Sequence, residues 1–454
     1  MRLHNLKFRK KLIFAFLISF FIQIFLIIGF NYFNWISQIS QNTFFYEFLR
    51  SSLEPYQDYQ IWYKSFVENL LHENWIPYTY FFPDIEGYTN WFSYLWDLFV
   101  GFRQYYYIYP PFFLYIITLP GLIDLNLIFI PLLISTNLLP IIIYKFLLTQ
   151  CNVKVAEWGF LTTIFCPLLI FYNGGLLLNT SLVTCFFIIT LYFISIKKYK
   201  SACILLATSF LFKQIVIFFI LPILAYIVIE SSKNKEGKFI TQYFKNLLIY
   251  STILSGTILI GSLPWIIINP RGYINSIFVT QGFTFLPDLQ IPNSNSPVHW
   301  YSFLVGLNLP YWTIYIVGFL SFSFIGIFVI EIIIIMFLHY WYYQKTLNWL
   351  KFLDIITYTA FSSHLFLPRG VYKYYFTFHV PIIILWLCFH FKDLNVEKNI
   401  DKIRWSIYFL GTSLIILVIP RNFYLLVIWV IIILIINKNI KINQTYYVKS
   451  SLLE

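Results

Sequence analysis

The chain has 454 residues, of which 59% are hydrophobic and 11% are charged. A soluble domain carries about 25% charged residues, so this chain cannot cover its apolar surface by folding alone in water, and we expect an integral membrane protein. A net charge of +12 would suit nucleic acid, but the basic residues are scattered between apolar blocks and form no stripe or known nucleic-acid-binding module, so no such partner is expected.

Apolar blocks long enough to cross a membrane recur along the whole chain. A helix needs roughly 20 apolar residues to cross the hydrocarbon core, and the first block, 12–31, reaches that length with no small-residue cleavage site behind it. We therefore predict an all-α polytopic membrane protein, with a single membrane domain over 1–454 and about twelve transmembrane helices. The spans are expected at 12–31, 125–147, 157–173, 176–196, 201–212, 214–230, 246–268, 311–338, 349–366, 374–390, 405–419 and 423–437.

The charges between these spans predict which side each loop faces. Lysine and arginine collect in cytoplasmic loops, so the basic segment 2–11 places the N-terminus inside, and alternation then places the C-terminus inside too. Two large outer loops remain, 32–124 and 269–310, and residues 32–104 of the first contain eight of the 19 acidic residues. This arrangement requires that the apolar segment 106–123 lies in the outer membrane interface as a helix and does not cross.

The first outer loop contains a predicted amphipathic helix over 54–71. Glu54 followed by Pro55 suits a first helical turn, and apolar or aromatic residues recur at helical spacing from Tyr59 onward, so the helix is expected to lie along the membrane surface. Asp58 lies one turn after Glu54. Two interpretations are open from the pattern alone: Asp58 stabilises the start of the helix, or it is a functional carboxylate.

Several uncommon elements of this loop follow one another in a particular order. They are Asp58-Tyr59, Trp62-Tyr63, Leu70-Leu71, Trp75-Ile76-Pro77-Tyr78 and the run from Tyr107 to Leu114, and farther along the chain Phe212-Lys213-Gln214 precedes Pro222. Together they resemble the first outer loop and a pair of short helices in GT-C-type membrane glycosyltransferases, in particular the polyprenyl-phosphate-mannose-dependent mannosyltransferases. The resemblance covers roughly residues 50 to 230 and agrees with the predicted number of spans.

The resemblance implies a reaction. Such an enzyme moves a hexose, with mannose favoured, from a polyprenyl- or dolichyl-phosphate carrier to a glycan, glycolipid or protein acceptor at the outer or lumenal face. An aspartate of the first outer loop acts as general base, and this role falls on Asp58, because a carboxylate within reach can take the acceptor proton as the bond to C1 forms. A single inverting displacement needs one carboxylate, and Glu54 is the candidate second acid.

Cations outside the first loop are candidates for holding the donor phosphate. The resemblance implies this role for Lys213, and the turn that contains Arg369 and Lys373 is similar to a basic and aromatic turn near the donor site of several GT-C enzymes. The alternative is that these long side chains lie at the membrane interface for ordinary solvation.

Three further side chains are expected to line the donor or acceptor pocket, namely Tyr59, Tyr109 and His364. This chain also departs from the family pattern at two places: Tyr109 stands where some members carry a lysine, and Gln57 stands where others carry a second acid.

Neither a metal nor another cofactor is expected to be required. The sequence has no Asp-x-Asp or His-Glu-x-x-His motif and no cluster of potential ligands at metal-binding spacing, although Glu54 and Asp58 together remain an alternative site for a divalent ion. Its five cysteines have neither Cys-x-x-Cys spacing nor a framework pattern, so disulfides are not expected.

Two other classes of membrane protein fit the composition. A transporter or lipid-linked sugar flippase places its polar groups near the midplane and often shows paired halves, whereas this chain concentrates acids in one outer loop and shows no halves. A polysaccharide ligase or polymerase usually has its large loop late in the chain, and here the larger loop comes first. The sequence therefore favours the glycosyltransferase over a transporter or flippase.

Overall fold

The computed structural model is predominantly helical in the part of the chain that it describes. The described residues are 10–31, 33, 35–41, 58–72, 77–78, 109–233, 239–274, 276–277, 310, 312, 324–365, 373–393, 399–419, 424, 427–428 and 430–431. Among them there is no strand, which confirms the predicted all-α class. A helix also lies within each predicted span up to residue 419.

The N-terminal half contributes a peripheral helix, a group of short helices and a central bundle. In chain order its elements are α1 (Lys10–Asn31), α2 (Trp35–Gln41), the π-helix η1 (Asp58–Tyr63), α4 (Lys64–His72), α6 (Pro111–Gly121), η2 (Leu125–Ile128), α7 (Phe129–Gln150), α8 (Val153–Ile164), the π-helix η3 (Leu169–Gly175), α9 (Thr180–Ser195), α10 (Tyr199–Phe212), η4 (Gln214–Val216) and α11 (Ile217–Ser232).

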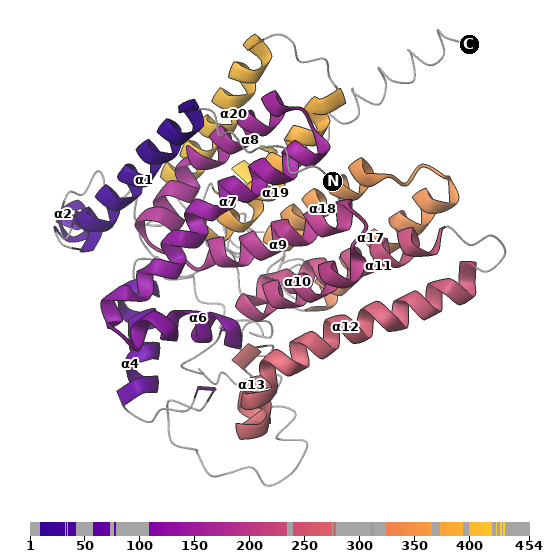
Figure 1. Cartoon of the computed structure of the whole chain (residues 1–454), viewed down its shortest axis with the longest axis horizontal. Helices are drawn as coiled ribbons and strands as arrows, with labels where there is room; N and C mark the ends of the chain where they lie inside the picture. The colour runs from indigo at the N-terminus through magenta and orange to yellow at the C-terminus, as the bar shows by residue number, and fades with distance from the viewer. Residues whose placement is uncertain are drawn as a thin grey trace.

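The remaining elements complete the bundle. They are α12 (Phe239–Ile268), α13 (Pro270–Ile274), α17 (Phe324–Tyr343), α18 (Trp349–Leu365), η6 (Lys373–Tyr375), α19 (Phe376–Asp393) and α20 (Asn399–Val418). Figure 1 shows α12 along one edge of the bundle and α1 along the opposite edge, while α4, α6 and α13 gather at one end.

Four helices of the described residues are long and apolar enough to cross a membrane: α1, η2 with α7, η4 with α11, and α12. The pair α8 and η3 makes a fifth if its 60° bend lies within one span. Pro167 stands in the break between the two helices, and a proline that removes a backbone donor is the usual cause of such a bend. The predicted number of about twelve spans is therefore met only in part, because other apolar helices, such as α9 and α10, are shorter.

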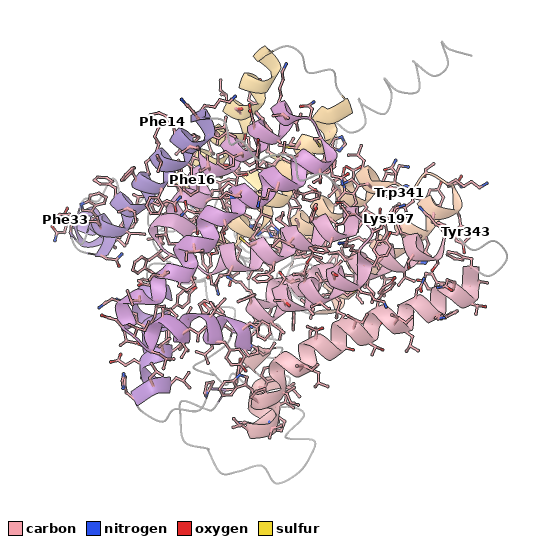
Figure 2. All side chains as sticks on the ribbon, viewed as in Figure 1. Phe14, Phe16, Phe33, Lys197, Trp341 and Tyr343 are labelled. Carbon is pink, nitrogen blue, oxygen red and sulfur yellow. The ribbon has the colours of Figure 1, made fainter. Side chains whose placement is uncertain are left out.

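The short helices lie where protein surrounds them. Most side chains of α9 and α10 are buried, whereas α1 and α12 expose many large apolar side chains. Phe14, Phe33 and Tyr343 lie at the margin of the bundle in Figure 2 and are more than half exposed. An exposed apolar margin fits contact with lipid, and helix breaks are tolerated at membrane depth only where protein covers the backbone.

Helix α1 is held to the bundle by polar groups as well as by apolar packing. Gln23 on α1 accepts a hydrogen bond of 3.0 Å from the amide of Asn137 on α7, and Ser19 donates one of 2.9 Å to the carbonyl of Ile164, where α8 ends. The space beside Gln23 exists because η3 has a glycine there: a Cβ on Gly174 would lie 2.5 Å from Gln23 Cγ.

We therefore expect Gly174→Ala to lower the stability of the protein by about 1–3 kcal/mol, because the added methyl group forces Gln23 away from Asn137. The measurement is the midpoint of thermal unfolding in detergent. Gly256→Ala on α12 is the matched control, since a Cβ there meets no atom within 4 Å. Equal midpoints for the two variants would contradict this account of how α1 is attached.

Candidate functional site

Helix η1 begins at Asp58 and is fixed by a cluster of aromatic rings. Tyr63, at the end of η1, is fully buried, and its ring lies 4.7 Å from that of Phe113 and 5.9 Å from that of Tyr109, centroid to centroid. Tyr59 is buried too, 6.5 Å from the Tyr63 ring. Tyr59 and Tyr109, the two tyrosines predicted to line the pocket, thus pack in the wall that positions the backbone of Asp58.

Of the two candidate acids, only Asp58 has a described backbone position. Asp58 is the first residue of η1, and the position of its carboxylate lies outside the described part of the structure. Glu54 and Arg369 also lie outside the described residues. The predicted helix over 54–71 is present from residue 58 as η1 followed by α4.

Tyr78, the last residue of the Trp-Ile-Pro-Tyr element, joins the first loop to the second. It is fully buried with a positive φ of 67°, a conformation uncommon for an aromatic residue. Its hydroxyl donates to the Tyr109 carbonyl at 2.8 Å, and its own carbonyl accepts from Asn269 at 3.3 Å. Its ring contacts Tyr273 on α13, whose pKa is raised by burial and lowered in part by the hydrogen bond to Ser262.

This junction depends on a glycine. A Cβ on Gly272 would lie 2.1 Å from the backbone oxygen of Tyr78, which cannot move as a flexible side chain can. We expect Gly272→Ala to separate residues 77–78 from α13 and to lower the thermal unfolding midpoint, at a cost of about 1–3 kcal/mol. Gly411→Ala on α20, where a Cβ meets nothing within 4 Å, should leave the midpoint unchanged. If the midpoint for Gly272→Ala equals that of the control, the junction does not contribute to the stability of the protein.

Lys213 occupies the break between α10 and η4 and is almost fully buried. Its ammonium nitrogen donates to Asn179 Oδ1 at 2.9 Å. It also lies 5.5 Å from the ring centroid of Tyr374 and 5.2 Å from that of Tyr375, within cation–π distance of both. The break places the lysine in an extended conformation between two apolar helices, where a charged group is costly, so Lys213 is a candidate functional residue.

Further buried polar side chains are bonded to Thr180, the residue that follows Asn179. The Thr180 hydroxyl donates to Asn173 Oδ1 at 2.5 Å, and Thr377 on α19 donates to Thr180 at 2.8 Å. We call Lys213, Asn173, Asn179, Thr180 and Thr377 the Lys213 cluster. It joins η3, the start of α9, the break after α10, and α19, and all five side chains are less than one-tenth exposed.

The other two predicted donor residues with described positions have structural contacts. Lys373 is buried and donates to the carbonyls of Leu417, at 3.2 Å, and Ile419, so it caps the end of α20. His364 is fully buried and shares a hydrogen bond with the hydroxyl of Tyr424. Its ring also lies 5.1 Å from that of His379, centroid to centroid.

The Lys213 cluster and η1 lie at the same end of the bundle. Phe112 on α6 packs against Phe212 with ring centroids 5.9 Å apart, and Phe212 directly precedes Lys213. The neighbouring Phe113 contacts Tyr63 of η1. One helix, α6, therefore separates the segment that starts at Asp58 from the buried lysine, and Figure 1 shows α6 between α4 and α10.

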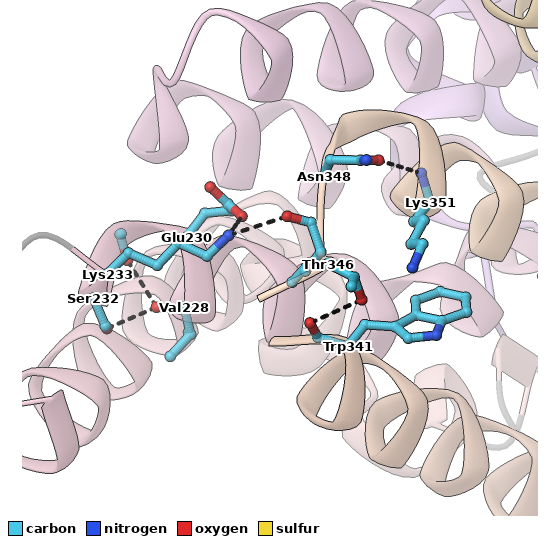
Figure 3. A network of polar contacts seen from close by, with 10 residues as sticks. Val228, Glu230, Ser232, Lys233, Trp341, Thr346, Asn348 and Lys351 are labelled. Atoms are coloured by element: carbon cyan, nitrogen blue, oxygen red, sulfur yellow. Dashed lines mark hydrogen bonds and ion pairs between the residues drawn. The ribbon is translucent and has the colours of Figure 1, made fainter. Parts of the chain in front are cut away.

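The opposite end of the bundle collects residues from the loops predicted to be cytoplasmic. Lys233, just after α11, pairs with Glu230 and lies near the Leu347 carbonyl, between α17 and α18. Figure 3 shows this network, with the nearby hydrogen bonds from the Lys351 backbone to Asn348, 2.9 Å, and from Thr346 to the Trp341 carbonyl, 3.3 Å. The two basic loops meet at one end, as the predicted alternation of spans requires.

Sequence reasoning missed Asn173, Asn179 and Thr180 as site residues. They stand in or beside apolar spans, where Asn179-Thr180-Ser181 also matches a glycosylation pattern without an accessible position for it. The available signal was an intramembrane polar run beside the matched lysine element.

The described residues contain no group of three or more His, Cys, Asp or Glu side chains that could hold a metal ion. What the site offers is a buried cation with amide and hydroxyl neighbours, on the same side of the bundle as an acid-bearing loop. No family model matches the chain, and no curated protein matches it in sequence.

Proposed function

We propose that this protein is a membrane hexosyltransferase of the GT-C type that uses a polyprenyl- or dolichyl-phosphate-linked sugar, with mannose favoured. The observation that carries the proposal is the placement of Lys213: a buried ammonium at a helix break, at the same end of the bundle as the helix that begins with Asp58. A phosphate carried on a lipid needs positive charge next to apolar surface, and this lysine supplies that combination.

In the proposed reaction Asp58 is the general base. The acceptor hydroxyl attacks C1 of the hexose and loses its proton to the carboxylate, while the bond from C1 to the phosphate oxygen breaks and its electron pair leaves with the polyprenyl phosphate. The configuration at C1 inverts. Because a phosphate leaves without protonation, one carboxylate suffices, and Glu54 serves as a neighbouring acid rather than as a nucleophile.

The donor phosphate is assigned first to Lys213. Arg369 remains a proposed ligand on the same turn as Lys373, while the bonds from Lys373 to the end of α20 support a structural role for that lysine. Tyr59 and Tyr109 form the wall beside the base. His364, which is fully buried and bonded to Tyr424, stays a proposed pocket residue.

The proposed location is an integral membrane protein with both termini in the cytoplasm and the site at the extracytoplasmic or lumenal face. The acceptor is a glycan, a glycolipid or a protein. The lysine-bearing loops that meet around Lys233 support this orientation, since they lie at the opposite end from Lys213.

The test is a transfer assay with purified protein in detergent or nanodiscs. We expect label to move from radiolabelled polyprenyl-phosphate mannose to an acceptor lipid or glycan, with inversion at C1. The same protein is then placed in sealed vesicles to follow movement of the labelled donor between leaflets. Movement without any transfer, from either a mannose or a glucose donor, would favour the flippase instead.

A further inference from the structure

The side-chain amide of Asn179 has a hydrogen-bond partner at its oxygen but none at its nitrogen among the described residues. Its oxygen accepts from Lys213 at 2.9 Å. A lysine ammonium can only donate, so this contact fixes which way the amide points. The nitrogen Nδ2 is buried, and among the described residues it has no hydrogen-bond partner.

The side-chain amide of Asn173 also has a partner at its oxygen and none at its nitrogen among the described residues. Asn173 Oδ1 accepts from Thr180, the residue that follows Asn179, and Asn173 Nδ2 is buried with no hydrogen-bond partner in the described structure. An unsatisfied buried donor is expensive, so each of these two calls for an explanation, such as a ligand that accepts from it. Amide donors linked to a buried cation, Asn179 directly and Asn173 through the adjacent Thr180, are groups suited to bind an oxyanion.

We propose that Asn179 and Asn173 bind the phosphate of a polyprenyl phosphate together with Lys213, with Asn179 both holding the lysine and donating to a phosphate oxygen. This inference rests on the proposed function for the choice of ligand. It adds two residues to the site and gives the unpartnered amide groups an acceptor. A lipid phosphate is favoured over a soluble one because the cluster lies between apolar helices, where Phe212, Ile215 and Val216 are buried beside Lys213.

The decisive variant is Asn179→Asp. The aspartate keeps an oxygen for Lys213, so a purely structural bond to the lysine would be preserved or strengthened. The same substitution replaces the Nδ2 donor by a second oxygen and adds a negative charge next to the phosphate. We therefore expect the affinity for polyprenyl phosphate to fall roughly 100-fold, and roughly 10-fold for Asn179→Ser, which loses the amide donor without adding charge.

The experiment measures binding of a radiolabelled polyprenyl monophosphate that carries no sugar to detergent-solubilised protein. The neutral polyprenol with the same chain tests recognition of the anion. Asn246→Asp is the matched control, because Asn246 is a buried asparagine near the opposite end of the bundle whose amide donates to Ser231 and Ser232. That variant should bind the phosphate as the wild type does, and Asn173→Asp should be weakened like Asn179→Asp.

Two results overturn the inference: wild-type affinity in the folded Asn179→Asp and Asn179→Ser variants, or equal binding of polyprenol and polyprenyl phosphate. Thermal unfolding of each variant identifies loss of the fold, and if the aspartate variant does not fold, the serine variant and Asn173→Asp decide. Because no sugar is present, the outcome is separate from that of the proposed function. A wild-type protein that binds the phosphate through these amides but transfers no hexose refutes the transferase and leaves this site standing.

Discussion

Asp58→Asn is expected to reduce hexose transfer by at least 10²–10⁴-fold, the usual contribution of a general base. Asparagine has nearly the same shape as aspartate but cannot take the proton from the acceptor hydroxyl. The rings of Tyr59 and Tyr63, which pack η1 against α6, are unchanged by this substitution. Donor binding and the thermal unfolding midpoint should therefore stay close to those of the wild type, and the measurement is kcat for label transfer at saturating donor.

Glu68→Gln is the matched control for this variant. Glu68 is an exposed acid on α4, in the same predicted outer loop and on the helix that follows η1. Its neutralisation should leave kcat unchanged, and Glu54→Gln should show whether the neighbouring acid contributes. Transfer by Asp58→Asn at near the wild-type rate would remove Asp58 from the base role, whatever the result for Glu54.

Lys213→Met is expected to lower kcat/KM for the lipid-linked donor roughly 100-fold, mainly by raising KM. Methionine retains the apolar stem of the side chain and its packing between α10 and α11 but removes the ammonium group. The loss is that of a charge-assisted contact in a water-poor site, which is worth several times more than one at a surface. The measurement is the dependence of transfer rate on donor concentration.

Two further variants separate charge from structure. Lys213→Arg restores the positive charge with a different shape, so it should recover part of the lost affinity. Lys351→Met removes a lysine that lies over the Trp341 ring at the opposite end and should leave KM unchanged. An unchanged KM in folded Lys213→Met would mean that this lysine only supports the break after α10, and the donor-phosphate assignment would be wrong.

Several features of the fold follow directly from the order of residues. Long apolar blocks with few charges require helices in a membrane, because hydrocarbon offers no partner for an open backbone. The predicted spans accordingly contain helices up to residue 419, and the segment predicted to lie in the interface contains α6, an 11-residue helix too short to cross by itself. Periodicity alone could not supply the lengths of the spans. Helices α9 and α10 are shortened by breaks, and such breaks are stable at membrane depth only where surrounding protein covers the backbone.

The candidate site also depends partly on the sequence alone and partly on the tertiary structure. The sequence by itself determined an all-helical chain rich in apolar spans, with acids concentrated early and a lysine between two apolar helices. Only the tertiary structure decided that Lys213 meets Asn179 and two tyrosines, that Lys373 caps α20, and that Tyr78 ties two loops together. Local pattern encodes which backbone is helical, but these partners lie dozens to hundreds of residues apart, and their contacts depend on how packed helices bring distant side chains to one end of the bundle.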